Sequence, residues 1–393
     1  MNNKGIDSII DNHFGKRVKQ AKYSYSDIIL SWVYANLCGA ERLEDVMLMK
    51  EHLSSIPYYK CPSSDRLSQV LRNKSEAITE IDGNLTETHC FSIDTKLNKL
   101  MLDIAKKLNV IDGNILDYDN VIIPTNKYDA SWTYKKIKGY QPGVSFINKT
   151  PVYIEGRGGN SNAVFKMKET LERSLNLLKE KQIPVKYFRS DSAAYQKYVV
   201  ELMNKNNIEF FIRVIKNNTL LDEIRYNMDN WETFNIGNQK IDVGEGTFIP
   251  FVNLRTKKKQ KAYRIVVTRI KINGEYIYRA IMTTNTSMSK EKVVDFYNKR
   301  GAIERNFDDL KNNFNWSRLP FSVLNENTTF LIISAIVSII YQYIVNLFSK
   351  KLDFVKHTFR LKNFIYHFIT VSSMWNKGKL KIFSQKSYEV LLE

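Results

Sequence analysis

The sequence predicts an α/β protein in which a mixed core of strands and helices is interrupted by a β-rich insertion and flanked by helical segments. Between residues 112 and 215, strand-like and helix-like patterns alternate along the chain. Residues 216 to about 286 read as strands joined by Gly and Asn turns, whereas the first ninety residues read as short helices. At 393 residues, the chain is long enough for two or three domains.

Residues 1–110 are expected to form a small helical domain. Ser26 can cap the helix "DIILSWVYANLC", which Gly39 would end, and "ERLEDVMLMKEHL" follows with helical periodicity. Ser63 or Ser64 can cap "DRLSQVLRN". Helical domains of this size often bind DNA, but no decisive helix-turn-helix signature is present, so packing and dimerisation remain equally open.

Residues 111–215 are expected to form the first part of the core. In "NILDYDNVII", Leu116 and Tyr118 share one strand face, and Asp117 and Asp119 share the other. The strands "GVSFIN" and "PVYIEG", the helix "AVFKMKETLERSLNLLKEK", the strand "VKYFRSD", the helix "AAYQKYVVELMNKN" and the strand "IEFFIRVI" follow. This order is the ribonuclease H-like layout, in which acids lie on the first strand, after the fourth strand and on a later helix.

The remaining chain divides into three segments. Residues 216–287 are the β-rich insertion, which includes an Asn273-Gly274 turn. Residues 288–325 return to the core, with one helix from about Ser289 to Phe314, and residues 326–393 form a helical C-terminal region. Within that region, residues 330–348 are uncharged and nearly long enough to span a bilayer, but a polar residue recurs every four positions, which favours a buried helix over a membrane span.

The charge of the chain favours a polyanionic partner. Lys and Arg number 59 against 41 Asp and Glu, which gives a net charge of +18 spread along the sequence. Nucleic acid is the expected partner, although ribosomal and membrane-surface proteins share this composition. The three separated cysteines predict neither a disulfide framework nor a zinc site, and the N-terminus has no apolar signal segment, so a cytoplasmic location is expected.

One helical stripe carries groups suited to phosphodiester chemistry. Tyr297, Arg300, Glu304 and Lys311 are spaced so that an α-helix, turning about 100° per residue, places them within roughly a 60° arc. The stripe surrounds a single carboxylate with a phenol and two cations. Ordinary surface charges and a half-buried tyrosine are the alternative interpretation.

A metal site for phosphoryl transfer needs more than one carboxylate. Asp119, Asp191 and Glu304 are the candidates, because the layout above brings them to one edge of the sheet. Asp117 on the same strand face and Asp94 in "FSIDTKL" compete with Asp119, and Asp191 has the alternative role of a helix N-cap. Three such acids would hold two Mg²⁺ ions, which Mn²⁺ can replace.

The same residues carry a family resemblance. Tyr297, Arg300, Glu304 and Lys311 match the Y-x2-R-x3-E-x6-K signature of DDE transposases of bacterial insertion sequences, and "YNKRGAIERNFDDLKNNFNWSRLPF" resembles the subgroup with Arg-Gly before the acid. The segments "LDYDNVIIPTNKYDASWTYKKIKGYQPGV", "FRSDSAAY" and "CPSSDRLSQVLR" resemble other parts of that subgroup in the same order. The likeness covers most of residues 60–350.

The resemblance implies a function for each part of the site. Asp119, Asp191 and Glu304 would hold the metal ions, and Tyr297, Arg300 and Lys311 would contact DNA phosphates. The implied enzyme cleaves transposon ends and joins the 3′-hydroxyl to target DNA, with double-stranded DNA as partner, a homodimer pairing the two ends, and a nucleoid-associated location in a bacterial cytoplasm. Asn120 and Ala193 depart from the residues that are common in the family.

Several interpretations remain open from the sequence. The resemblance also implies cut-and-paste chemistry through a DNA hairpin, with an insertion aromatic holding a displaced base. Trp231 is the only tryptophan in the insertion and is either that aromatic or a packing residue. Lys257, Lys258, Lys259 and Lys261 either touch DNA or form a solvated hairpin tip. The rival functions are a catalytically inactive or domesticated DNA-binding relative and a basic membrane-associated protein.

Overall fold

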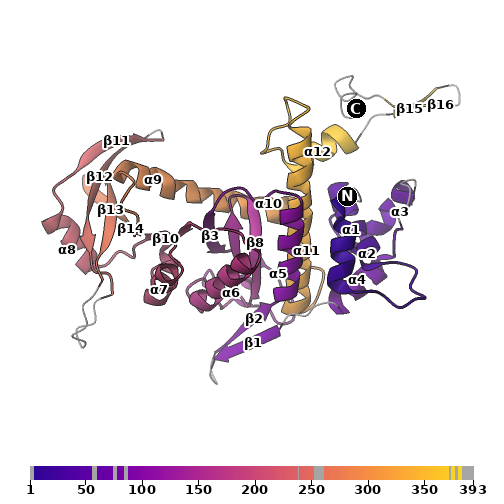
Figure 1. The fold of residues 1–393 in the computed structure, drawn as a ribbon, viewed down its shortest axis with the longest axis horizontal. Helices are drawn as coiled ribbons and strands as arrows, with labels where there is room; N and C mark the ends of the chain where they lie inside the picture. The colour runs from indigo at the N-terminus through magenta and orange to yellow at the C-terminus, as the bar shows by residue number, and fades with distance from the viewer. Residues whose placement is uncertain are drawn as a thin grey trace.

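A single eleven-stranded sheet forms the spine of the molecule in the computed structural model (Figure 1). The structure describes residues 4–54, 60–73, 78–83, 87–237, 239–251, 261–370, 373–376 and 379–382. The strands, in spatial order, are β1 (Ile78–Gly83), β2 (Thr88–Ile93), β8 (Thr150–Arg157), β7 (Gly143–Ile147), β3 (Ile115–Asn120), β9 (Tyr187–Ser190), β10 (Glu209–Arg213), β14 (Glu275–Thr283), β13 (Tyr263–Ile272), β12 (Gln239–Phe248) and β11 (Glu232–Ile236).

The middle of this sheet has the connectivity that the sequence predicts. Strands β3, β7 and β8 are antiparallel neighbours, whereas β3 pairs with β9, and β9 with β10, in parallel. Helix α6 (Met167–Glu180) joins β8 to β9, and helix α7 (Lys197–Lys205) joins β9 to β10. Leu116 and Tyr118 point into the apolar core, which leaves Asp117 and Asp119 on the other face of β3. Strand β3, the first of the core in sequence, therefore lies at the centre of the five strands β8, β7, β3, β9 and β10.

The β-rich insertion continues the same sheet. Strand β14 pairs antiparallel with β10, so β11 to β14 extend the core away from the helical end of the molecule (Figure 1). The turn between β13 and β14 is at Asn273 and Gly274, whose φ angles of 50° and 87° fit the expected two-residue hairpin. Helix α8 (Asn218–Asn227) precedes these strands, and α9 (Lys290–Asn298) packs against them.

The helical prediction for residues 1–110 is wrong for residues 78–83 and 88–93, which are strands, and helices form the described chain before them. The helices there are α1 (Ile6–Phe14), α2 (Tyr25–Leu37), the 3₁₀ turn η2 (Leu43–Asp45), α3 (Val46–Ser54) and α4 (Ser64–Asn73). Beyond them, β1 and β2 form a hairpin that joins β8 of the main sheet, and α5 (Thr95–Lys107) packs on β8. The β-branched and aromatic residues of "THCFSI" pair along the sheet edge, so this segment is a strand.

The cap of α2 also differs from the expectation. The Ser24 hydroxyl accepts a hydrogen bond from the Asp27 N–H at 3.0 Å, and the Asp27 carboxylate accepts one from the Ser24 N–H at 2.8 Å. Ser26 instead donates its hydroxyl to Asp11 at 2.8 Å. Ser24 is therefore the N-cap of a reciprocal capping box, and Ser26 ties α1 to α2. Gly39 follows the helix with a φ of 101°, and Ser63 precedes α4 as one of the two expected caps.

The long apolar helix α11 (Leu324–Phe348) is the centre of the helical end. By length and composition it is the one helix among the described residues that could cross a membrane, but 78% of its most apolar window is buried inside the protein. Its polar residues point inward, since Gln342 accepts a hydrogen bond from the Thr150 hydroxyl of β8 at 2.9 Å. Helix α11 is therefore a core helix, as its polar periodicity indicated.

The C-terminal region is not helical throughout. Helix α12 (Leu361–Phe364) and the π-helical turn η5 (Ile365–Ile369) follow α11, and they are succeeded by paired strands β15 (Ser373–Asn376) and β16 (Lys379–Ile382). In β16, lysines alternate with Leu380 and Ile382, which is the two-residue period of a strand. The expectation of a helical region to residue 393 is wrong for these eight residues.

The helix expected from Ser289 to Phe314 is divided. Ser289 caps α9 by accepting from the Lys292 N–H, as expected for its start. The helix then changes to a 3₁₀ turn, η4 (Lys299–Gly301), and resumes as α10 (Ala302–Asn313). A 3₁₀ turn advances about 120° per residue instead of 100°. The four residues of the stripe consequently do not lie on one continuous face.

Candidate active site

Asp119 and Asp191 come together at the ends of two neighbouring parallel strands. In the pairing of β3 with β9, Asp117 lies opposite Arg189, and two residues further along each strand are Asp119 and Asp191. The ends of parallel strands meet at one edge of a sheet. Burial raises the pKa of Asp119 most strongly and the negative charge of Asp191 raises it as well, whereas Arg300 lowers it; together these effects bring the pKa to about 6. The two carboxylates therefore form an electrostatically coupled pair.

Two residues from the segment expected to be the late helix contact the ends of the strands that lead to this pair. The guanidinium Nη1 of Arg300 lies 3.2 Å from Oδ2 of Asp119. The Tyr297 hydroxyl donates a hydrogen bond to the carbonyl of Ser190, the residue before Asp191, at 3.3 Å. Burial raises the pKa of the Tyr297 phenol, which keeps its proton available for donation. Tyr297 and Arg300 thus bind the end of one strand each.

Asp117, the alternative first acid, has a structural role. Both of its oxygens accept hydrogen bonds from Arg189, at 2.8 Å from Nε and 2.6 Å from Nη2. Arg189 also donates to the carbonyl of Phe296 in α9 at 2.6 Å, and both members of the pair are almost fully buried. This ion pair joins β3, β9 and α9 beneath the candidate site. Arg189 is not among the residues predicted from the sequence, although an arginine in an apolar strand beside an acid-bearing strand signals such a pair.

Asp94, the other alternative, caps a helix. Its Oδ1 accepts a hydrogen bond from the Leu97 N–H at 2.9 Å at the start of α5. Asp191 is both a cap and a neighbour of Asp119. Its Oδ1 accepts a hydrogen bond from the Ala193 N–H at 2.9 Å at the start of the 3₁₀ turn η3 (Ser192–Ala194). Among the residues that the structure describes, no backbone N–H donates a hydrogen bond to its Oδ2.

Glu304 does not join the acidic pair in this structure. It is exposed on the first turn of α10. In the ranges that the structure describes, no three His, Cys, Asp or Glu side chains lie close enough together to hold a metal ion. The structure thus assembles Asp119, Asp191, Tyr297 and Arg300, and it leaves Glu304 in solvent one helical turn after Arg300.

The charges that affect Lys311 are not those of the acidic pair. Burial lowers the pKa of its amine; Asp308 opposes this effect and the positive charge of Lys135 reinforces it. Lys135 lies in the loop between β5 (Ser131–Trp132) and β6 (Lys138–Tyr140), which belong to a small three-stranded sheet with β4 (Ile123–Pro124).

The acidic pair has the chemistry of a divalent-cation site. Carboxylate oxygens are the ligands that Mg²⁺ prefers in proteins. The raised pKa of Asp119 shows that Arg300 does not offset the combined cost of burial and of the second carboxylate. A cation between the two acids would supply the missing positive charge, so this donor set fits a metal ion.

The insertion residues singled out in the sequence lie elsewhere. Trp231 donates its indole N–H to the carbonyl of Met228 at 3.0 Å, and the Arg269 guanidinium stacks 4.2 Å from its ring centre. These contacts favour the packing role over base holding. Lys261 donates to Asn204 at 3.3 Å, whereas Lys257, Lys258 and Lys259 fall outside the described residues.

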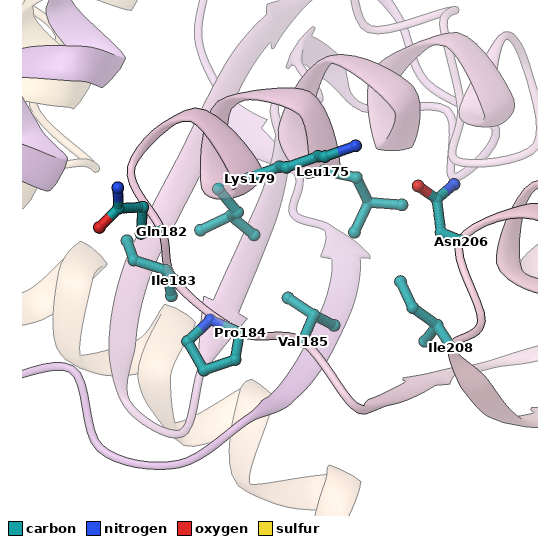
Figure 2. A pocket seen from close by; sticks show the side chains of 9 residues that line it. Leu175, Lys179, Gln182, Ile183, Pro184, Val185, Asn206 and Ile208 are labelled. Atoms are coloured by element: carbon teal, nitrogen blue, oxygen red, sulfur yellow. The ribbon is translucent and has the colours of Figure 1, made fainter.

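The apolar cavity in Figure 2 is separate from the acids. It has a volume of about 380 Å³ and lies between the end of α6 and the segment leading into β9. Pro184 and Val185 line it before β9 begins, whereas Asp191 follows the other end of that strand. The cavity and the candidate site therefore lie at opposite ends of β9.

Comparisons with known proteins identify a family. The family model described as "Transposase DDE domain group 1" matches residues 1–364. A search of curated proteins finds no match. Among solved structures, the chain is similar to the piggyBac transposase in a cryo-EM structure of its synaptic complex with hairpin DNA, with a TM-score of 0.43 and 13% identity over 93% of this chain and 77% of that one. On the family match, which spans nearly the whole sequence, this chain belongs to the group 1 DDE transposases.

Proposed function

We propose that this DDE transposase cleaves phosphodiesters at the ends of an insertion sequence and joins the freed 3′-hydroxyl to target DNA by a cut-and-paste route. The observation that carries the proposal is the coupled pair of Asp119 and Asp191 at the ends of β3 and β9. The strand order β8-β7-β3-β9-β10 supports a ribonuclease H-like core, in which this sheet edge carries the catalytic acids.

Asp119, Asp191 and Glu304 would hold two Mg²⁺ ions, for which Mn²⁺ can substitute. When bound, such ions activate the attacking oxygen and stabilise charge on the leaving oxygen. Glu304 would reach the pair through a reorientation of α10 from its present position. The 3₁₀ turn η4, between two α-helices, is the place where such a change of direction is easiest, because its hydrogen-bond geometry is weaker than that of the flanking helices.

Arg300 is proposed to exchange partners during the reaction. In the present structure its charge partly balances Asp119. A cation at the acidic pair would take over that role and free the guanidinium to bind a DNA phosphate beside the cut, in the two-pronged manner that arginine favours. Tyr297, held on the Ser190 carbonyl, would position this end of the helix and contact the same phosphate region. Lys311 would bind the backbone further along.

Double-stranded DNA is the proposed substrate, both as transposon end and as target. The net charge of +18 supports binding through phosphates, which weakens as salt increases. A homodimer is proposed because the two ends of one element must be held together. The helices before Asn73 are the proposed site of end recognition.

The test is a nicking and strand-transfer assay on element-end DNA with Mg²⁺, comparing the wild type with Glu304→Gln, Asp119→Asn and Asp191→Asn. Each substitution should abolish cleavage while leaving DNA binding intact. Asp308→Asn is the matched control, because Asp308 is also an exposed acid and lies one turn further along α10. Equal cutting by the wild type and Glu304→Gln would disprove the role of Glu304.

A catalytically inactive DNA-binding relative is the second candidate function. The exposure of Glu304 and the lack of a three-acid group in the described residues favour it. This candidate predicts DNA binding without cleavage in Mg²⁺ or Mn²⁺. Cleavage by the wild type in either metal rules it out.

A further inference from the structure

A surface of exposed aromatic rings and lysines lies beside the candidate site, and we call it the hairpin patch. It comprises Trp132, Tyr134, Lys135, Lys138 and Lys311. Trp132 and Tyr134 are each 66% exposed, whereas Thr133 between them is buried. This alternation directs both rings to the solvent side of the hairpin. Large rings exposed beside one another contribute little to the core, and such a group of rings is typical of a binding surface.

The hairpin that carries these rings is held in place. Trp132 pairs with Lys138 across β5 and β6, and the loop is closed by the Thr133 N–H, which donates to the Ile137 carbonyl at 2.9 Å. The Tyr140 hydroxyl bonds to Oδ1 of Asp129, and Oδ2 of Asp129 accepts from the Leu324 N–H at the start of α11, at 2.8 Å. The small sheet is therefore anchored to the core, and the rings are presented on a fixed support.

Backbone packing beneath the hairpin adds to this support. A Cβ atom on Gly159 would overlap the carbonyl oxygens of Ser131 and Gly139, so the chain after β8 passes directly under β5 and β6. Only glycine permits this approach. A preformed surface loses little conformational entropy when it binds a ligand.

The charges of the patch are positive and close together. The Lys135 amine lies 5.7 Å from the ring centre of Tyr134. The charge of Lys135 also acts on Lys311, since it helps to lower the pKa of the Lys311 amine. Like charges held together in this way favour an anionic ligand. Flat rings interleaved with cations are the combination by which proteins bind single-stranded nucleic acid, through base stacking and phosphate contacts.

The hairpin that carries the patch follows β3 at the same end of that strand as Asp119. The Asn120 amide, next to Asp119, donates to the Gln141 carbonyl at 2.9 Å, so the chain returning from the hairpin passes beside the first acid. Gln141 is three positions after Lys138, which corresponds to roughly 10 Å at about 3.3 Å per residue. A DNA strand running from the acidic pair would reach the patch within a few nucleotides.

We propose that the hairpin patch binds unpaired nucleotides of the DNA strand next to the cleavage site. Trp132 and Tyr134 stack on bases, and Lys135, Lys138 and Lys311 contact the phosphates between them. The inference deepens the proposed function, on which it rests, because it names single-stranded DNA beside the cut as part of the substrate. A duplex would present its bases to the rings only at an opened or frayed end.

The test measures the binding of two probes in EDTA: an oligo(dT) strand of roughly 12 nucleotides, within the range of known single-strand sites, and a blunt duplex. The double variant Trp132→Ala/Tyr134→Ala should bind oligo(dT) about ten-fold or more weakly, while its duplex affinity stays unchanged. Trp132→Phe/Tyr134→Phe should restore most of the affinity for oligo(dT). Tyr198→Ala is the matched control, because Tyr198 is 64% exposed on α7.

The outcomes separate this inference from the proposed function. Unchanged oligo(dT) binding by the double alanine variant overturns the inference, even if the protein cuts DNA. An equal loss for oligo(dT) and for the duplex also overturns it, because the patch would then be a general backbone contact. A wild type that binds oligo(dT) through the patch yet cuts no DNA in Mg²⁺ or Mn²⁺ contradicts the proposed function alone.

Discussion

The guanidinium of Arg300 lies 3.2 Å from the carboxylate of Asp119, and this contact joins the late helix to the first strand of the core. The two residues are 181 positions apart in the chain. Asp119 is buried beside a second carboxylate, so Arg300 supplies the nearest balancing charge. The pair therefore marks where the family signature of the helix meets the acids of the sheet.

Arg300→Ala should lower the rate of DNA cleavage by roughly 10²- to 10³-fold, the usual cost of losing one positioned donor at a site of developing charge. Arg300→Lys should give an intermediate rate, because lysine keeps the charge and loses the planar fork. Single-turnover cleavage of element-end DNA measures this effect. Arg305→Ala, on an exposed position of α10, is the control and should cut normally. Wild-type cleavage by Arg300→Ala would contradict the assigned role.

The raised pKa of Asp119 predicts a pH-dependent stability of the metal-free protein. An ordinary aspartate has a pKa of about 3.9 in the unfolded chain, so between pH 4 and pH 6 the unfolded state loses a proton that the folded state retains. Folding stability is therefore lost as the pH rises through this window. Asp119→Asn removes the effect.

The free energy of unfolding of Asp119→Asn relative to the wild type should accordingly increase by roughly 2 kcal/mol between pH 4 and pH 8. Urea denaturation in EDTA at the two pH values measures the difference, and the comparison cancels any constant contribution from the altered contact with Arg300. A difference that is the same at both pH values would show that Asp119 titrates normally. Saturating Mg²⁺ should reduce the destabilisation at pH 8, because a bound cation favours the ionised form.

The buried pair of Asp117 and Arg189 predicts a large loss of stability when it is broken. Asp117→Asn or Arg189→Gln should lower the free energy of unfolding by roughly 3–5 kcal/mol, because each leaves a buried charge without its partner. The double variant should lose less than the sum of the two. Denaturant titration measures the three values, and additive losses would mean that the pair is not coupled.

The contact between β8 and α11 predicts a rescue. A Cβ atom on Gly156 would overlap the hydroxyl of Thr328, so Gly156→Ala should cost roughly 1–3 kcal/mol of stability. Adding Thr328→Ala removes the overlapping oxygen and should restore part of the loss. Thermal unfolding of the single and double variants checks this prediction. No loss in Gly156→Ala would mean that α11 is not packed tightly on the sheet.

The middle of the sheet was predictable because local patterns specify it. The alternation of Leu116, Asp117, Tyr118 and Asp119 gives the faces of β3, and Asn273-Gly274 gives the turn of the β13–β14 hairpin. The hairpin of β1 and β2 was missed because its short segments are stabilised by pairing with β8, a contact distant in sequence. The extension of the sheet from β10 into β14 depends on a similar distant pairing.

The candidate site was only partly predictable. Asp119, Asp191, Tyr297 and Arg300 lie where strand ends and helix spacing place them. The position of Glu304 was not predictable from a 100° periodicity. The 3₁₀ turn at Lys299–Gly301 precedes Glu304 in the chain and changes the rotation per residue between Tyr297 and Glu304. Arg189 was missed because its role depends on the register of β9 against β3, which residue spacing alone does not give.

The most direct test of the account is a structure of the protein with element-end DNA and Mg²⁺, in which the distances from the bound ions to the three carboxylates are measured. The account predicts that Asp119, Asp191 and Glu304 each lie about 2.1 Å from an ion and that Arg300 has moved from Asp119 to a phosphate. A complex in which Glu304 stays in solvent, or in which Arg300 still occupies Asp119 and no ion binds between the two aspartates, would contradict it.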